Sequence, residues 1–280
     1  MEARGDIAMQ KPTLTLSKKQ IALFHQEGYL VVPVVITLEE LERLREIFNH
    51  LFASKAGRED GNQYDLAGTD KDDQEAVLPQ IVNPSKYAPE LETADIRDNT
   101  YAIARQLLGP EATSQSDHAI MKPPEVGAVT PWHQDEAYWA PDLEYNSISI
   151  WVPLQEVTLE NGCMHFIPGS HKLEVAAHRP IGQDSRIHGL EAEHVDASQA
   201  VACPIAAGGA TIHHCRTIHY AGPNHTNHPR LAYINVFATP PKQRVISRDF
   251  YWKDSRQTLR DERRRAAGTK PTSDGRQIGS

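Results

Sequence analysis

Residues 147–154 read SISIWVPL, a run whose β-branched and aromatic side chains favour an extended strand. Segments of the same character recur at 114–122, 127–133, 163–167, 201–205, 210–219 and 230–238. Turn signals separate them, namely Pro123-Pro124, Asn161-Gly162, Pro168-Gly169, Gly208-Gly209 and Gly222-Pro223. Many short strands divided by such turns predict a β-sandwich or jelly-roll barrel, which we place at residues 111–240.

The part that precedes these strands, residues 12–110, has the patterns of helices. Capping boxes start at Ser17 and Thr37, and each predicts the beginning of a helix. A stripe of apolar residues at helical spacing predicts that the second helix packs on the barrel: Leu38, Leu41, Leu44, Ile47, Phe48 and Leu51. Pro89 predicts the start of a third helix, which Gly109-Pro110 ends.

Shorter segments lie between these helices. Residues 29–36 and 78–82 have strand composition, and Pro33 limits the first to an edge or an interrupted strand. Residues 54–76 are polar and contain several glycines, which predicts a mobile loop.

An insertion and a tail complete the chain. Residues 172–200 lack a strand pattern and are a candidate lid over the barrel. Residues 247–280 predict a charged helix followed by a polar, disordered stretch. Four arginines are expected on a solvated face of that helix: Arg260, Arg263, Arg264 and Arg265. No linker divides the chain, so we predict a single domain over residues 1–280.

Bulk properties narrow the class of protein. A net charge of −8 at pH 7 argues against a nucleic acid or an anionic membrane as partner, and favours a small-molecule substrate. The three cysteines are scattered and imply no disulfide framework. Residues 1–11 are polar, and no run approaches the roughly 18 apolar residues that span a bilayer. We therefore predict a cytoplasmic protein, of undetermined oligomeric state.

A candidate metal site begins at His133-Gln134-Asp135. In a strand, residues i and i+2 point to the same face, so His133 and Asp135 can present an imidazole and a carboxylate side by side. Such a triplet also arises by chance, and the chain has a second one, His194-Val195-Asp196, in an acidic loop sequence. A third ligand is therefore needed to support a metal site.

The segment 211–219 supplies that ligand. It contains three histidines, and period-two spacing places His213 and His219 on one face and His214 on the other. His219 lies at the expected strand end, where a substrate can reach it. Two histidines and one carboxylate leave the other metal positions open for non-haem Fe(II) oxygen chemistry.

Arg230 follows His219 by eleven positions and opens the strand 231–237. An arginine that points into a barrel is costly unless it meets an anion. Its planar guanidinium pairs bidentately with a carboxylate, so a dicarboxylate cosubstrate is a suitable partner. The alternative is an edge-strand charge that faces water.

These residues together resemble the phytanoyl-CoA dioxygenase family, whose members are Fe(II)- and 2-oxoglutarate-dependent oxygenases. The matching stretches are Trp132–Asp135, Ile150–Leu154, Asn161–Met164, Phe166–Lys172, and His219–Asn224 followed by Arg230. The resemblance covers roughly residues 17–240. It implies a mainly β fold with flanking helices around a double-stranded β-helix, the cupin-like jelly roll.

The resemblance also implies roles for single residues. His133, Asp135 and His219 would be the catalytic iron ligands, and Arg230 would hold the distal carboxylate of 2-oxoglutarate. Trp151 has the family's position beside the cosubstrate. Gln80 stands where some members carry a polar or basic cosubstrate contact, and His118 is assigned to the same pocket.

The function implied is a dioxygenase that uses Fe(II), 2-oxoglutarate and O2 to hydroxylate an unactivated C–H bond, releasing succinate and CO2. Related halogenases carry a small residue at the position of Asp135, so its carboxylate favours hydroxylation, while desaturation, ring formation and epimerisation stay open. The rivals are a divalent-metal hydrolase and a non-catalytic jelly-roll metal-binding or sensor protein. Tyr138 and Trp139 are candidates for either substrate contact or core packing; surface placement is expected for Lys122, Arg179 and Arg186.

Overall fold

The computed structural model describes residues 15–268. Two predictions concern residues outside this range. One is that residues 1–11 contain no signal peptide, and the other is that the end of the tail, from residue 269, is polar and disordered.

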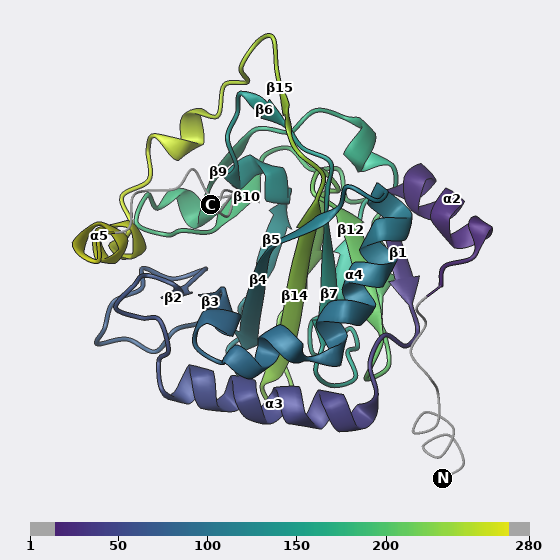
Figure 1. Cartoon of the computed structure of the whole chain (residues 1–280). Coiled ribbons are helices and arrows are strands. Elements are labelled where there is room, and N and C mark those ends of the chain that lie inside the picture. The colour runs from purple at the N-terminus through teal and green to yellow at the C-terminus, as the bar shows by residue number, and fades with distance from the viewer. Residues whose placement is uncertain (1–14, 269–280) are drawn as a thin grey trace.

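Two antiparallel sheets form the core (Figure 1). The larger sheet has the order β1 (Tyr29–Val32), β12 (Ala210–His214), β7 (Ser147–Pro153), β14 (Arg230–Ala238), β4 (Thr113–Lys122), β3 (Pro79–Val82) and β2 (Gln63–Asp65). The smaller sheet has the order β11 (Val201–Cys203), β8 (Met164–Phe166), β13 (His219–Ala221) and β5 (Thr130–His133). Side chains from both sheets share one apolar cluster, so the sheets pack face to face, as a jelly roll requires.

Strand β7 shows how the sequence separates the two faces of the larger sheet. Ile148, Ile150 and Val152 belong to the core that packs beneath the helices, whereas Trp151 belongs to the cluster between the sheets. Because successive side chains point to opposite faces, the serines at 147 and 149 share the inner face with Trp151. The two serine side chains of β7 therefore face the cavity described below.

The prediction of one continuous strand over residues 210–219 is wrong, because two strands occupy this segment. Strand β12 ends at His214, a turn follows, and β13 begins at His219. This turn carries the chain from the larger sheet to the smaller one. His213 and His219 nevertheless lie close together, with ring centroids 4.2 Å apart.

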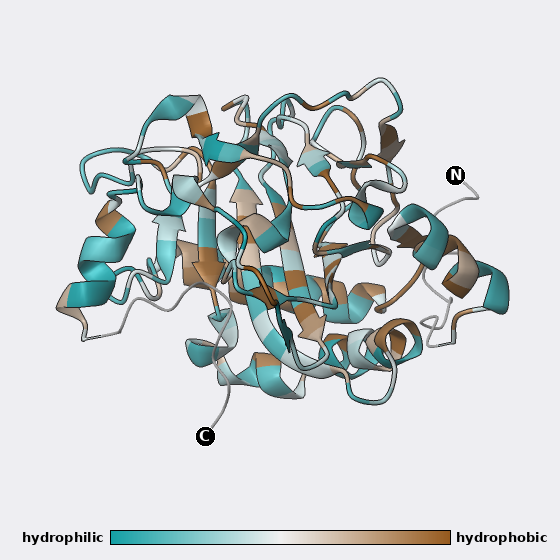
Figure 2. Ribbon diagram, turned by 90° about the horizontal axis from the view of Figure 1, so that it is seen from above, coloured by the Kyte–Doolittle hydropathy of each residue, from teal (hydrophilic) through white to brown (hydrophobic). Residues whose placement is uncertain are grey.

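Helices cover the outer face of the larger sheet. Both predicted caps lie at helix starts: Ser17 forms the complete capping box before α2 (Lys18–Glu27), whereas Thr37 caps α3 (Leu38–Ala53) by accepting from the backbone N–H of Glu40. Phe48 of α3 packs on Tyr233 with ring centroids 5.1 Å apart. Figure 2 shows the hydrophobic residues gathered among the strands and on inward helix faces, with hydrophilic residues outside.

The third expected helix is divided. A 3-10 helix, η2 (Pro89–Thr93), precedes α4 (Asp95–Leu108), because Ala94 between them has an extended backbone with φ −73° and ψ 136°. The first expected strand stops at Val32, directly before Pro33.

The predictions of a mobile loop at 54–76 and a strandless insertion at 172–200 are both wrong in part. Residues 63–65 form β2, and Asp70 is a buried ion-pair partner. The insertion contains a two-stranded hairpin, β9 (His178–Pro180) and β10 (Leu190–Ala192). The remaining short elements are η1 (Pro84–Lys86), η3 (Asp135–Tyr138), β6 (Leu143–Glu144), η4 (Ser170–Lys172), η5 (Ile181–Gln183), β15 (Lys242–Gln243) and η6 (Tyr251–Lys253).

The helix of the tail, α5 (Leu259–Ala266), begins later than expected, after the N-cap Thr258. The prediction of a solvated arginine face is wrong for most of its members. Arg260 and Arg264 are buried and Arg263 pairs with Asp70, while Arg265 is exposed as expected. Within residues 15–268 no helix has the length and apolar character to cross a membrane. The single-domain organisation stays a prediction.

Candidate metal centre and active-site cavity

Three potential metal ligands converge between the sheets. His133 ends β5, His219 begins β13, and the two residues are direct partners in the β13–β5 pairing. Asp135 begins η3. One ligand atom from each of these side chains lies within 4.8 Å of the others, and no other such group of three occurs in residues 15–268.

The geometry of Asp135 differs from the expected strand. The strand ends at His133, but Gln134 keeps an extended backbone, with φ −124° and ψ 134°, so Asp135 still points to the side of His133. Its Oδ1 lies 3.8 Å from Nε2 of His133 and 3.6 Å from Nε2 of His219. The spacing argument therefore holds although the carboxylate belongs to a 3-10 helix.

Backbone carbonyls fix the tautomers of both histidines. Nδ1 of His133 lies 2.8 Å from the carbonyl oxygen of Pro131, and Nδ1 of His219 lies 2.9 Å from that of Thr217. Because a carbonyl only accepts, each Nδ1 carries the hydrogen and each Nε2 keeps its lone pair toward the ligand group. Burial lowers the pKa of His133 and His219, which also favours the neutral, metal-binding form.

Asp135 is held by two neighbours through one oxygen. Oδ2 accepts a hydrogen bond from Oγ of Ser149 at 2.7 Å and lies 3.2 Å from Nε2 of His213, which leaves Oδ1 toward the two histidines. Burial opposes the charge of Asp135, but the surrounding histidines, foremost His219, outweigh it and hold the pKa of the carboxyl below its ordinary value. His213 thus supports the site without belonging to the triad.

Arg230 lies at the start of β14, 2% exposed, with its guanidinium carbon 5.2 Å from the ring centroid of Trp151. Its Nε and Nη1 have no hydrogen-bond partner among the described residues. Burial lowers the pKa of Arg230 to about 9. A buried guanidinium in this state requires an anion, so the chemistry of the pocket fits the distal carboxylate of a dicarboxylate.

Lys122 is the direct partner of Arg230 in the β14–β4 pairing. The expected surface placement is wrong, because Lys122 is 1% exposed and its Nζ donates to the carbonyl oxygen of Ala128 at 2.8 Å. Burial, and secondarily Arg230, lower the pKa of Lys122 well below its ordinary value.

Gln80 and His118 lie together on neighbouring strands. Nε2 of Gln80 donates to the hydroxyl of Tyr64 at 3.0 Å and lies 3.0 Å from Nδ1 of His118. An amide NH2 only donates, so Nδ1 of His118 accepts. The structure thus joins two residues that are 38 positions apart in the chain.

One cavity of about 640 Å³ connects these groups. Its wall includes the triad and all four expected cosubstrate residues, namely Arg230, Trp151, Gln80 and His118. Tyr138 and Trp139 also line it, and each also packs against a small buried apolar cluster, so the structure gives both residues a place at the cavity and in core packing. Sequence reasoning missed Tyr64, His188, Arg260 and Arg264, which reach the cavity from the segments expected to be a loop, a lid and a solvated tail.

Several further polar side chains do not belong to the triad. Residues 194 and 196 are exposed. Arg179 pairs with Glu191 at 2.8 Å and Arg186 with Asp184 at 2.6 Å. Both arginines thus form ion pairs at the surface of the insertion, as expected. Burial raises the pKa of the Cys215 thiol well above its ordinary value, which argues against a nucleophile.

Comparison with known proteins gives concordant matches. The model of the family described as Phytanoyl-CoA dioxygenase (PhyH) matches residues 24–232. A protein named probable alpha-ketoglutarate-dependent hypophosphite dioxygenase, from Stutzerimonas stutzeri, is 26% identical over 204 residues, which are 71% of each chain. The crystal structure of EvdO2 from Micromonospora carbonacea var. aurantiaca is similar with 41% identity and a TM-score of 0.77, over 87% of this chain and 99% of that one. EvdO2 complexed with 2-oxoglutarate gives 36% identity and a TM-score of 0.75, with the same coverage.

Proposed function

Because the chain belongs to the phytanoyl-CoA dioxygenase family, it is an Fe(II)- and 2-oxoglutarate-dependent dioxygenase, and we propose that His133, Asp135 and His219 hold its iron. The observation that carries this assignment is the convergence of the three ligand atoms within 4.8 Å. Two nitrogens and one carboxylate oxygen are the donor set of non-haem Fe(II) oxygenases.

Arg230 is proposed to hold the distal carboxylate of 2-oxoglutarate. Support comes from its two unpartnered buried nitrogens and from its place in the same cavity as the triad. Trp151 packs against the guanidinium and limits its orientation. Gln80 and His118, bonded to each other on the cavity wall, are proposed as further cosubstrate contacts.

The proposed reaction is hydroxylation of an unactivated C–H bond in a small molecule. When bound, iron and 2-oxoglutarate activate O2, and turnover releases succinate and CO2 as the hydroxyl enters the substrate. The residues of the chain orient the reactants: Ser149 and His213 fix the carboxylate of Asp135, and Tyr138 lines the cavity beside His133. A relative named for hypophosphite supports a small polar substrate. A cytoplasmic location is proposed from the sequence composition.

The test is an anaerobic titration of the protein with Fe(II) and 2-oxoglutarate, followed by visible absorption. We expect a charge-transfer band that His219→Ala abolishes and that the exposed His194→Ala leaves intact. A band that persists in His219→Ala would contradict the iron assignment. Turnover without 2-oxoglutarate would instead favour the divalent-metal hydrolase.

A further inference from the structure

A second buried cation lies beside Arg230. Lys122 ends β4 and is the direct partner of Arg230 in the β14–β4 pairing. Directly opposed residues of an antiparallel pair point to the same face of the sheet, with their Cβ atoms about 4.5–5.5 Å apart. The two side chains are 1% and 2% exposed. Two positive side chains are therefore held next to each other and away from water.

The alternation along β4 defines the side to which Lys122 points. Ser116, His118 and Ile120 line the cavity. Successive side chains of a strand alternate between its faces, so Lys122, two positions beyond Ile120, points to the same side. Lys122 does not line the cavity itself, whereas Arg230 does. The ammonium group thus lies on the cavity side of the sheet, but behind the surface that a ligand can touch.

The loops at this end of the barrel cover Lys122. Its Nζ donates to the carbonyl oxygen of Ala128 at 2.8 Å. Its backbone oxygen accepts from Nδ2 of Asn224, in the loop that precedes β14, at 3.1 Å. Because the site is closed to water, the charge of Lys122 is screened much less than a surface charge.

Neither cation has a negative partner within residues 15–268. Nε and Nη1 of Arg230 form no hydrogen bond there, and Nζ of Lys122 bonds to a neutral carbonyl. Repulsion between two adjacent buried cations therefore remains in the ligand-free chain. An anion at Arg230 would remove this repulsion.

The titratable groups around the pair do not compensate its charge. The thiol of Cys163 interacts electrostatically with Arg230, but burial raises the pKa of this thiol, which keeps it neutral. The titratable side chains of the adjoining loops are exposed to water: Glu125, His225 and His228. Burial, and secondarily Arg230, lower the pKa of Lys122 well below its ordinary value.

We propose that Lys122 is a specificity-determining residue of the cosubstrate site, which together with Arg230 selects a 2-oxo acid that carries a distal carboxylate. This inference rests on the proposed function, in which Arg230 holds that carboxylate. A carboxylate at Arg230 contacts the guanidinium, is attracted by the ammonium group behind it, and removes the repulsion between the two cations. A 2-oxo acid without a distal carboxylate gains none of these interactions.

The test compares 2-oxoglutarate with 2-oxopentanoate, which has the same carbon chain but no distal carboxylate. Each is titrated by calorimetry into the full chain with Fe(II), under anaerobic conditions. Lys122→Met should weaken the binding of 2-oxoglutarate by about tenfold, because it removes one charge of the site, and should change the binding of 2-oxopentanoate by less than about twofold. Lys19→Met, at an exposed position of α2, is the matched control and should change neither affinity.

A merely structural role of Lys122, in which it only fixes Ala128, would weaken the binding of both acids equally in Lys122→Met. That result would overturn the proposal, as would an unchanged affinity for 2-oxoglutarate. Arg230→Met separates the inference from the proposed function. If only Arg230→Met weakens 2-oxoglutarate binding, the role of Lys122 alone is wrong. Wild-type affinity in Arg230→Met would contradict the assignment of the distal carboxylate to Arg230, and this inference with it.

Should Lys122→Met fail to fold, the pH dependence of the wild-type chain decides. Burial and Arg230 favour the neutral form of Lys122 in the ligand-free chain, and a bound carboxylate favours the charged form, so binding takes up a proton. The preference for 2-oxoglutarate over 2-oxopentanoate should therefore fall as the pH rises from about 6 to about 8, below the pKa of Arg230 at about 9. A preference that does not depend on pH in this range would overturn the proposal.

Discussion

At the scale of single residues, the proposed metal centre depends on which atom each side chain leaves available. Asp135 offers Oδ1 because Ser149 and His213 occupy Oδ2. His133 and His219 offer Nε2 because carbonyls occupy Nδ1. Partners of this kind orient the ligands, and their loss typically costs ten- to a hundredfold in metal affinity.

We therefore expect Ser149→Ala to weaken Fe(II) binding by about tenfold, measured by titration of the charge-transfer band. Ser147→Ala is the matched control, because Ser147 lies on the same face of β7 but donates to the carbonyl oxygen of Phe237 at 2.9 Å. Equal Fe(II) affinity in both variants would contradict the proposed role of Ser149.

Arg230→Met has two opposed consequences. The affinity for 2-oxoglutarate should fall by about tenfold to a hundredfold, because a charge-assisted bond contributes about 1.5–3 kcal/mol. The free energy of unfolding of the ligand-free chain should rise by about 1 kcal/mol or more, since two buried nitrogens of Arg230 lack partners. Urea unfolding and 2-oxoglutarate titration check both, with the exposed Arg186→Met as control. Unchanged 2-oxoglutarate affinity would remove Arg230 from the pocket.

Local signals explain which residues could be predicted from the sequence. His133 and Asp135 stand two positions apart and His219 precedes a Gly-Pro turn, which made them candidates, and the resemblance to the family then selected them as the iron ligands. The place of Arg260 and Arg264 in the cavity wall could not be predicted in this way. Their burial depends on the docking of α5 on Gly61 and Asp70, about 200 positions away, and a charged helix face gives no signal of it.

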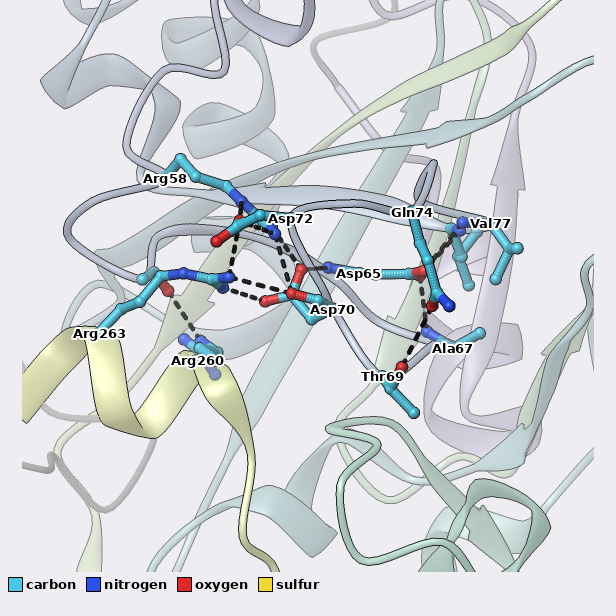
Figure 3. Close-up of polar contacts among 12 residues, drawn as sticks. Arg58, Asp65, Ala67, Thr69, Asp70, Asp72, Gln74, Val77, Arg260 and Arg263 are labelled. Atoms are coloured by element: carbon cyan, nitrogen blue, oxygen red, sulfur yellow. Dashed lines mark hydrogen bonds and ion pairs between the residues drawn. The ribbon is translucent and has the colours of Figure 1, made fainter.

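At the scale of elements, a cluster of ion pairs determines where α5 lies (Figure 3). Its members are Asp70, Asp72, Arg58 and, from α5, Arg263. Both arginines that Asp70 pairs with are partly exposed, at 16–17%, whereas Asp70 itself is 4% exposed. Asp72 contacts the same two arginines but is 78% exposed. The two carboxylates of this cluster thus differ in burial, and we expect them to differ in their contribution to the free energy of unfolding.

Asp70→Asn should lower the free energy of unfolding by about 3 kcal/mol, because it leaves two partly buried guanidinium groups without their charge partner. Asp72→Asn should cost no more than about 1 kcal/mol, as an exposed pair does. Urea unfolding measures both values. Hydrogen exchange at residues 259–266 should accelerate only in Asp70→Asn, and equal exchange in the two variants would mean that other contacts hold α5.

At the scale of the whole molecule, alternation and turn signals predicted the jelly roll because each strand carries its own pattern. Strands β4, β7 and β14 lie within one or two residues of the expected bounds. The break between β12 and β13 was not predictable, because residues 210–219 keep strand composition through the turn that changes sheets. The hairpin β9–β10 was missed because its two three-residue strands, His178–Pro180 and Leu190–Ala192, contain no β-branched residue.

Buried neutral histidines make the stability of this core depend on pH. Nε2 of His178 accepts from the backbone N–H of Gln134, as Nε2 of His188 accepts from Arg260, so neither ring binds a second proton readily. Burial lowers the pKa of His178 to about 4 and that of His188 well below its ordinary value. In the unfolded chain both have a pKa near 6.5.

Below about pH 6.5 the unfolded chain therefore binds protons that the folded chain does not, and stability falls as the pH falls. From pH 7.5 to 5.5 the two histidines together should lower the free energy of unfolding by about 2–3 kcal/mol. Urea unfolding at the two pH values measures this loss. His178→Gln and His188→Gln should each remove about half of it, whereas His225→Gln, at an exposed position, should leave it unchanged. An equal pH dependence in all three variants would mean that other groups, and not these two rings, couple protonation to folding.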